Sequence, residues 1–344
     1  MLEHYDVPGV SIALIKDFEI ERLLVYGVKS QNTQAPVRTD TLFQAASISK
    51  AVAAVAALKM SQDGVIDLDE DINNELISWT VEDNQYTQQE KVNLRRLLSH
   101  TAGTTVHGFA GYNNSELVPT MQQILNGEAP ANSPAVVVSG VPGNRFSYSG
   151  GGYVIAQQAL VDVTQQSFAD MMRETVLAPL AMTSSSFNQD LSQESVSRVS
   201  AGHNFHGQNI PGDYHLYPEM SAAGLWTTPE DLAKLLIELQ LSLRNESNKV
   251  LAGNVIEEML TPVGGPVFNT ANEFYGLGFS LWKQGDEFAF GHGGANAGFR
   301  AKMQAHKTAG TGYVVMTNGE NGDAVIQAIE SLIEKTESQD PSQF

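Results

Sequence analysis

The sequence predicts an α/β fold in which an antiparallel sheet, flanked by helices, is built from both ends of the chain. Two observations lead to this expectation. Strand-like runs gather near the N-terminus and again near the C-terminus, and mostly helical patterns lie between them. We therefore expect an α/β domain formed by residues 1–65 and 266–344, with residues 66–265 inserted as a mainly helical region.

The N-terminal third begins with a predicted hairpin. Residues 10–15 and 20–26 are apolar and rich in β-branched side chains, and the short segment KDFE separates them. A polar loop then leads into FQAASISKAVAAVAALKM, residues 43–60, which is apolar on nearly every helical face. A helix of this kind is expected to be buried, and Gly64 is a suitable residue to end it.

Further elements follow from capping residues and periodicity. Residues 94–98, 153–163 and 168–177 are predicted helices, and Thr228 followed by Pro229 starts another. Four strand-like runs come later, namely FYGLGFSLW, EFAFGHGG, GFRAKMQA and GYVVMTNG. An amphipathic helix over residues 323–335 completes the predicted fold.

Composition excludes several classes of function. Lys and Arg number 20 and Asp and Glu 39, so the formal net charge is −19 and the chain should repel nucleic acid and anionic membrane surfaces. The absence of cysteine excludes disulfides, thiolate catalysis and cysteine-based zinc sites. No apolar run is long enough for a membrane span, and the N-terminus shows no signal-peptide pattern. The oligomeric state stays open.

Ser47 and Lys50 form the first candidate catalytic pair. They stand three residues apart at the start of the apolar helix, so their side chains should be neighbours on one helical face. Burial there would move the pKa of Lys50 toward neutrality and make its amine a possible base. The helix N-terminus would also offer backbone N–H groups to an oxyanion beside Ser47. The second Ser-x-x-Lys, Ser280 to Lys283, lies in a strand-like run and is excluded.

Two later segments could complete a site. Tyr148 lies in a glycine-rich turn just before a predicted helix, where a second proton carrier could stand. His292, Gly293 and Gly294 lie on a strand-like run, where bare backbone could approach a ligand.

These three segments together resemble a known family. In order, SISK (residues 47–50), YSG (148–150) and HGG (292–294) resemble the three motifs of penicillin-recognising serine enzymes. The branch in question holds class C β-lactamases, D-alanyl-D-alanine carboxypeptidases and related esterases. VPGVSIALI, LLSHTAG, AAGLWTTPEDLA and YGLGFSLW resemble the same branch, so the likeness covers nearly the whole chain.

The resemblance implies a role for each motif. Ser47 would be the acylated nucleophile, and Lys50 and Tyr148 would share the duties of general base and general acid. The backbone N–H groups of Ser47 and Ala295 would form the oxyanion hole, and His292 would supply a cation that orients a substrate carboxylate. The resemblance further implies no metal or cofactor, a D-amino-acid peptide, β-lactam or ester as substrate, and a periplasmic or extracellular location.

Two positions depart from the family pattern. Gly150 stands where the second motif has Asn, and Gly293 stands where the third has Thr. Loss of these polar side chains argues against efficient β-lactam hydrolysis and predicts a roomier substrate-binding site. We therefore expect a penicillin-binding, D-amino-acid-peptidase-like or carboxylesterase-like hydrolase. A β-lactamase, or a penicillin-binding sensor without turnover, is the alternative.

Other polar residues receive simpler interpretations. The HGG segment resembles the oxyanion strand of α/β-hydrolases, but the chain has no Gly-x-Ser-x-Gly. The group His203, His206, Asp213 and His215 is assigned to a polar loop rather than to a metal site. His100 should satisfy backbone groups in its loop, and Arg300 should lie on a solvated strand edge. The remaining candidates are assigned to packing: Tyr112, Tyr217 and Trp226.

Overall fold

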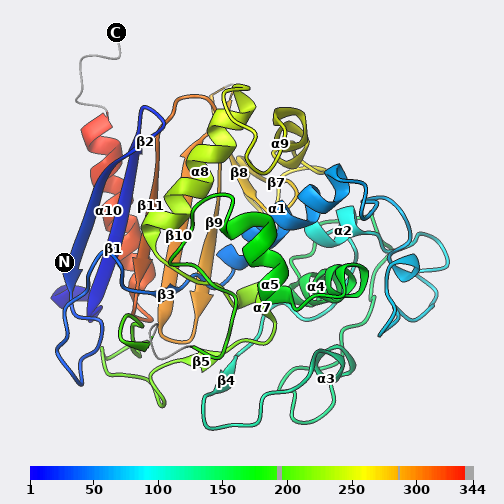
Figure 1. Ribbon diagram of the computed structural model, residues 1–344, viewed down its shortest axis with the longest axis horizontal. Coiled ribbons are helices and arrows are strands. Elements are labelled where there is room, and N and C mark those ends of the chain that lie inside the picture. Colours follow the sequence, from blue (N-terminus) through cyan, green and yellow to red (C-terminus); the bar gives the residue numbers. More distant parts are fainter. Residues whose placement is uncertain (192–195, 286, 338–344) are drawn as a thin grey trace.

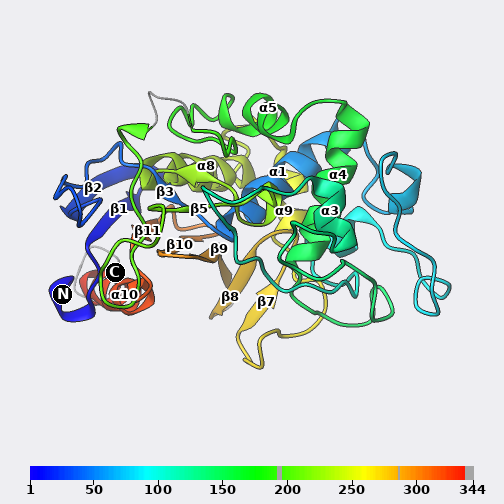
Figure 2. The same cartoon turned by 90° about the horizontal axis from the view of Figure 1, so that it is seen from below.

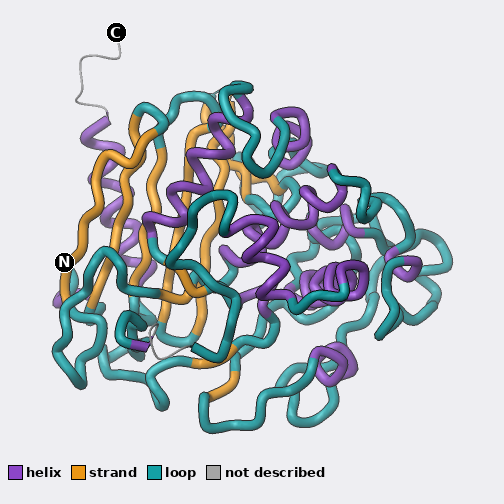
Figure 3. Tube along the Cα trace, in the orientation of Figure 1, coloured by secondary structure: helices purple, strands orange, loops and turns teal. Residues whose placement is uncertain are grey.

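The structure is a computed structural model that describes residues 1–191, 196–285 and 287–337. Its main element is a seven-stranded antiparallel sheet (Figures 1 and 3). The strand order is β2-β1-β11-β10-β9-β8-β7. The strands are β1 (Gly9–Lys16), β2 (Glu19–Gly27), β7 (Glu273–Tyr275), β8 (Ser280–Gln284), β9 (Glu287–Asn296), β10 (Phe299–His306) and β11 (Gly312–Thr317). The prediction of one antiparallel sheet built from both ends of the chain is confirmed.

Helices cover both faces of this sheet. Helix α10 (Gly322–Glu337) lies on one face, and α8 (Pro229–Leu243) and α1 (Ile48–Gln62) lie on the other (Figure 2). The alternation of side chains along β1 explains why two layers form. Val10 and Ile12 pack with the apolar face of α10, whereas Ala13 and Ile15 belong to the core beneath α8 and α1.

The remaining described elements are helices and two small ladders, most of them on the side of the sheet that α1 covers. The helical ones are η1 (Glu3–Tyr5), η2 (Ile72–Asn74), α2 (Leu94–Leu98), α3 (Met121–Asn126), α4 (Gly150–Thr164), α5 (Phe168–Met172), η3 (Arg173–Leu177), α7 (Met220–Ala223) and α9 (Gly253–Met259). Two small ladders join β3 (Phe43–Gln44) to β6 (Trp226–Thr227) and β4 (Tyr112–Asn113) to β5 (His215–Leu216). None of the helices in the described part of the chain has the length and apolar character needed to cross a bilayer.

Most predicted elements lie where the sequence placed them, with two instructive differences. The predicted helix over residues 168–177 ends as α5 at Met172 and continues as the wider turn η3. The run FYGLGFSLW forms two strands, β7 and β8, rather than one. Gly278 turns the chain between them with φ +87°, and a Cβ there would lie 2.3 Å from Cβ of Ala54 in α1. The predicted boundaries of the inserted region stay a prediction.

Burial of α8 against the sheet should contribute strongly to stability. Leu236 is fully buried in α8, so Leu236→Ala should lower the free energy of unfolding by about 2–5 kcal/mol through lost burial and a cavity. Urea denaturation monitored by circular dichroism measures the change. Leu117→Ala, at a position 80% exposed, is the matched control and should change stability by less than about 0.5 kcal/mol. Equal effects of the two substitutions would contradict this account of the core.

Candidate active site

Ser47 lies at the sharp turn between β3 and α1. Ala46, the residue before it, has φ +50°, a left-handed conformation that non-glycine residues seldom adopt. The N–H groups of Ile48, Ser49 and Lys50 donate to the carbonyls of Ala45, Ala46 and Ser47. Within the described residues, no acceptor takes the Ser47 N–H. The first free donor of the helix N-terminus therefore belongs to the same residue as the candidate nucleophile.

Lys50 is a buried lysine whose amine contacts the Ser47 hydroxyl. Its Nζ lies 3.0 Å from Ser47 Oγ and donates a 2.8 Å hydrogen bond to the Ala222 carbonyl. The side chain is only 2% exposed, and burial lowers the pKa of Lys50 to about 7 because the ammonium form loses its hydration. Near neutral pH a large fraction of this amine is uncharged and able to accept a proton.

Tyr148 faces the same pair. Its ring centroid is 5.1 Å from Lys50 Nζ, and its hydroxyl hydrogen-bonds with the Ser47 side chain. Burial raises the pKa of Tyr148 well above its ordinary value, and the bond to Ser47 only partly offsets this. The phenol is therefore neutral at physiological pH and suited to passing a proton on rather than to acting as a phenolate base.

Strand β9 approaches the start of α1 through bare backbone. A Cβ at Gly294 would lie 2.2 Å from the Ala45 carbonyl oxygen, so only glycine permits this contact. Strand β8 pairs with β9 only as far as Gly291, which leaves residues 292–296 bonded to β10 alone among the described strands. A cavity of about 270 Å³ opens here, lined by Ser47, Tyr148, Gly293, Gly294, Ala295, Ala301, Lys302, Asp323 and Ile326.

The surroundings of His292 argue against the expected cationic role. The imidazole is 5% exposed, and burial, reinforced by the charge of Lys50, lowers the pKa of His292 to about 3. Nδ1 lies 2.5 Å from the Gly293 carbonyl and so carries the proton, while Nε2 accepts a 3.1 Å hydrogen bond from Tyr275 Oη. Both nitrogens are occupied and the ring is neutral, because the site offers it no solvent and no carboxylate.

Gly150 is not surrounded by open space. Gly150 begins α4, and a Cβ there would lie 3.0 Å from Cε2 of Phe109 and 3.2 Å from the His107 carbonyl oxygen. The Phe109 ring and the backbone of its loop therefore lie close to any side chain that would replace Gly150. At Gly293, by contrast, the nearest atom to a Cβ is 4.0 Å away, so that position is open.

The other polar candidates are engaged in structural bonds. Arg300 is not on a solvated edge, since it is half-buried, donates to the Asn296 carbonyl at 2.8 Å and pairs with Glu320. His203 Nδ1 lies 2.6 Å from the Asn318 carbonyl, and its Nε2 accepts from Gln31 N–H. No group of three or more histidine, aspartate or glutamate side chains gathers into a metal-binding cluster within the described ranges. Tyr112, Tyr217 and Trp226 are buried.

Sequence reasoning missed three contributors to this site. The Ala222 carbonyl orients Lys50, Tyr275 holds His292, and Phe109 fills the place beside Gly150. Ala222 lies in AAGLWTTPEDLA, a stretch that resembles the family, but nothing in the sequence joins a backbone carbonyl to a distant lysine.

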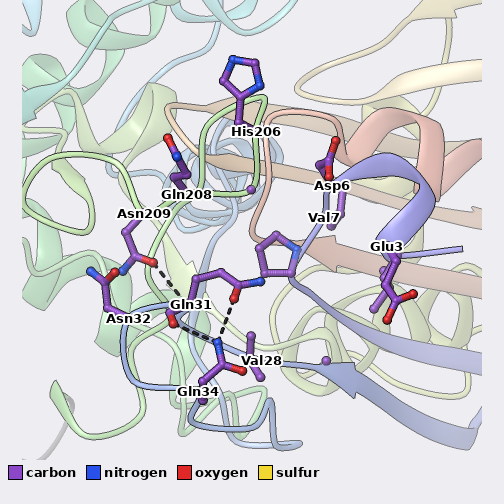
Figure 4. Close-up of a pocket in the computed structure, with 14 residues that line it drawn as sticks. Glu3, Asp6, Val7, Val28, Gln31, Asn32, Gln34, His206, Gln208 and Asn209 are labelled. Carbon is purple, nitrogen blue, oxygen red and sulfur yellow. Dashed lines mark hydrogen bonds between the residues drawn. The ribbon is translucent and has the colours of Figure 1, made fainter.

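A larger cavity, about 900 Å³, lies elsewhere and contains none of these residues (Figure 4). Its lining comes from the N-terminal segment, the loop after β2 and residues 206–209. Several of its amides bond within the protein: Gln34 Nε2 donates to the carbonyl and side-chain oxygens of Gln31, and Gln31 N–H donates to Asn209. The smaller cavity beside Ser47 is the one with reactive groups in its wall.

Comparisons with known proteins agree with this geometry. A family model described as Beta-lactamase matches residues 1–334. "Protein flp" from Staphylococcus aureus (strain MRSA252) is 24% identical over 338 residues, which are 96% of this chain but 63% of that protein, so the chain spans less than two thirds of that relative's length. The octameric penicillin-binding protein homologue from Pyrococcus abyssi has a TM-score of 0.75 at 22% identity, with 93% of this chain and 71% of that chain covered.

D-amino acid amidase from Ochrobactrum anthropi SV3, in a complex with L-phenylalanine amide, has a TM-score of 0.74 at 24% identity, and 94% of each chain is covered. At these identities the solved structures establish a shared fold, whereas the family model spans nearly the whole sequence. The chain therefore belongs to the β-lactamase family.

Proposed function

We propose that this protein is a serine hydrolase that acts through an acyl-enzyme on Ser47. The observation that carries the proposal is the 3.0 Å contact between Ser47 Oγ and an amine whose pKa burial lowers to about 7. Burial disfavours the charged form of a lysine, so a large fraction of this amine is neutral near pH 7. A neutral amine beside a serine hydroxyl at a helix N-terminus can act as the base that activates the hydroxyl.

In this proposal each group has one step. Lys50 accepts the Ser47 proton as Oγ attacks a substrate carbonyl, and the N–H groups of Ser47 and Ala295 stabilise the oxyanion. Neutral Tyr148, hydrogen-bonded to Ser47, passes a proton to the leaving group. Protonated Lys50 then returns its proton to Tyr148, which restores both the neutral phenol and the neutral amine. In the second half of the reaction Lys50 accepts a proton from the attacking water molecule and gives it to Ser47 Oγ as the acyl group leaves.

The charges around the cavity favour a substrate without a terminal carboxylate. His292 is neutral at physiological pH, and Lys302 in the cavity wall is paired with Glu330. Phe109 next to Gly150 offers an apolar surface where an amide group would bind a β-lactam or peptide. The proposed substrates are therefore neutral-ended esters and amides of small acyl groups, and the likeness to D-amino acid amidase supports including amides.

Trapping the acyl-enzyme tests the proposal directly. Intact-protein mass spectrometry after mixing with p-nitrophenyl esters, amino-acid amides and a fluorescent penicillin should show transient acylation by the esters or amides, together with product release. Ser47→Ala should abolish both. Stable penicillin labelling without turnover would instead identify a binding module, and labelling that persists in Ser47→Ala would refute the assigned nucleophile.

The pKa of Lys50 gives the reaction a pH profile with a defined sign. Protonated Lys50 cannot accept the Ser47 proton, so kcat/KM for an uncharged ester should rise as pH increases through about 7 and then level off. Lys50→Arg, which stays cationic, should lose about 10²–10⁴-fold in kcat/KM. A profile without this rise, or an active arginine variant, would remove Lys50 from the role of base.

The same experiment separates Lys50 from His292. An ester carrying a carboxylate should show the same pH dependence as the uncharged ester, since burial lowers the pKa of His292 to about 3 and the ring stays neutral throughout the assay range. Selective weakening of the anionic ester as pH rises through about 6.5 would restore a cationic histidine.

The two glycines of β9 form a matched pair for the oxyanion hole. Gly294→Ala must push β9 away from the Ala45 carbonyl and should lower kcat/KM by about 10–100-fold, because misplacement of a donor by about 1 Å is enough for such a loss. Gly293→Ala leaves β9 in place, because its Cβ would enter the open space of the cavity, and any loss should be smaller than that of Gly294→Ala. Steady-state kinetics on one ester, with thermal unfolding as a check on folding, decides the matter. Equal losses would count against this placement of β9.

A further inference from the structure

His100 lies between α2 and the segment that carries Tyr148. It is 2% exposed, and its backbone has φ +58°, so the loop LLSHTAG turns sharply at this residue. None of the steps assigned above uses this side chain. A buried imidazole in a left-handed turn beside a reactive cavity therefore needs an explanation of its own.

His100 accepts two hydrogen bonds from the residues on either side of Tyr148. The Ser147 N–H donates to the His100 carbonyl at 2.7 Å, and the Ser149 N–H donates to His100 Nδ1 at 3.0 Å. The residues immediately before and after Tyr148 are thus bound to one residue. Since Nδ1 accepts, the imidazole proton belongs on Nε2, which has no hydrogen-bond partner within the described part of the chain.

The His100 ring also supports the Tyr148 ring directly. Their centroids are 4.1 Å apart with 38° between the planes, the shortest ring-to-ring separation recorded for Tyr148. Tyr275 and Phe146 pack against His100, with centroids 4.9 and 5.8 Å away. The imidazole is therefore wedged between the tyrosine and a set of buried rings, and its position limits where Tyr148 can go.

Charge is consistent with this arrangement. Burial, together with the nearby charge of Lys50, keeps the pKa of His100 well below its ordinary value. A neutral ring can accept the Ser149 N–H, whereas a protonated ring would have to break that bond. Neutral His100 also places no second cation next to Lys50.

We propose that His100 is a positioning residue, which fixes the Tyr148 hydroxyl against Ser47 by binding both flanking backbone N–H groups and packing against the phenol ring. This inference rests on the proposed hydrolase function, in which Tyr148 passes a proton to the leaving group and must therefore stay close to Ser47. The structural claim can be tested separately: removal of the imidazole acceptor should move Tyr148.

Two substitutions separate the acceptor from the ring. In His100→Asn, the amide oxygen can take the place of Nδ1 and asparagine tolerates a positive φ, so the Ser149 bond is retained while the ring is lost. His100→Phe keeps a ring but leaves the Ser149 N–H without its acceptor. We expect kcat to fall by about 10–100-fold in His100→Phe with KM little changed, and His100→Asn to recover most of the loss.

A double-mutant cycle shows whether the effect passes through Tyr148. If it does, His100→Phe should add almost nothing to the loss already caused by Tyr148→Phe, since residues that act as a unit are not additive. His203→Phe is the matched control: it also removes a buried imidazole that accepts a backbone N–H, but its partners carry none of Ser47, Lys50 and Tyr148. It should lower thermal stability and leave kcat unchanged.

Crystal structures of the two His100 variants provide a readout that is independent of turnover. The Tyr148 hydroxyl should leave Ser47 in His100→Phe and stay in place in His100→Asn. An unmoved Tyr148 in His100→Phe, additive losses in the cycle, or equal losses of kcat in His203→Phe would each overturn the inference. A wild-type protein without any acylation of Ser47 would refute the proposed function instead, and the position of Tyr148 in the variants would still decide the structural claim.

Discussion

The enclosure of one amine beside one hydroxyl is the constraint on which the rest of this structure depends. Lys50 is buried in a helix of alanine, valine and leucine, and among the described residues its Nζ hydrogen-bonds to Ser47 Oγ and to the Ala222 carbonyl. Neither carries a negative charge, and the carbonyl and the rings of Tyr148 and Tyr153 near Nζ do not outweigh the hydration that the ammonium form loses on burial. Burial disfavours the charged form of Lys50 and lowers its pKa to about 7, so the neutral amine is available as a base near neutral pH.

The elements around the start of α1 keep solvent away from Lys50. The N–H of Leu225 donates to Ser49 Oγ, and α7 presents the Ala222 carbonyl, so the segment 222–227 is bound to the first turn of α1. On the opposite side, Gly294 brings β9 against Ala45. The sheet, α7 and the Tyr148 segment meet around a single helix N-terminus, where backbone donors are available without any side-chain cost.

The sequence was sufficient for the parts of this account that depend on local spacing. The hairpin, the buried helix and the capped helix at Thr228 follow from periodicity and capping, and the three-residue spacing places Lys50 beside Ser47 because a helix has 3.6 residues per turn. The order of three motifs indicated the family. These features are encoded within short windows of residues, so they could be recognised before the structure.

What the sequence did not reveal depends on contacts between distant segments. A histidine in place of the motif's lysine indicated a cation, but burial and the charge of Lys50 lower the pKa of His292 and make it neutral. A glycine in place of asparagine indicated space, but Phe109 from another loop fills that space. In both cases the sequence gives the residue itself but not the distant residues that surround it. Those surroundings determine the charge of His292 and the space beside Gly150.

Direct titration of Lys50 is the measurement that tests the central claim most closely. With ¹³C-labelled lysine and the Lys50→Arg variant for assignment, the chemical shift of the Lys50 ε-carbon can be followed by NMR as pH is raised. The account predicts a midpoint near the value of about 7 that burial gives this amine. A midpoint near 10.4, roughly the ordinary lysine value, would mean that Lys50 stays charged at neutral pH and cannot be the base.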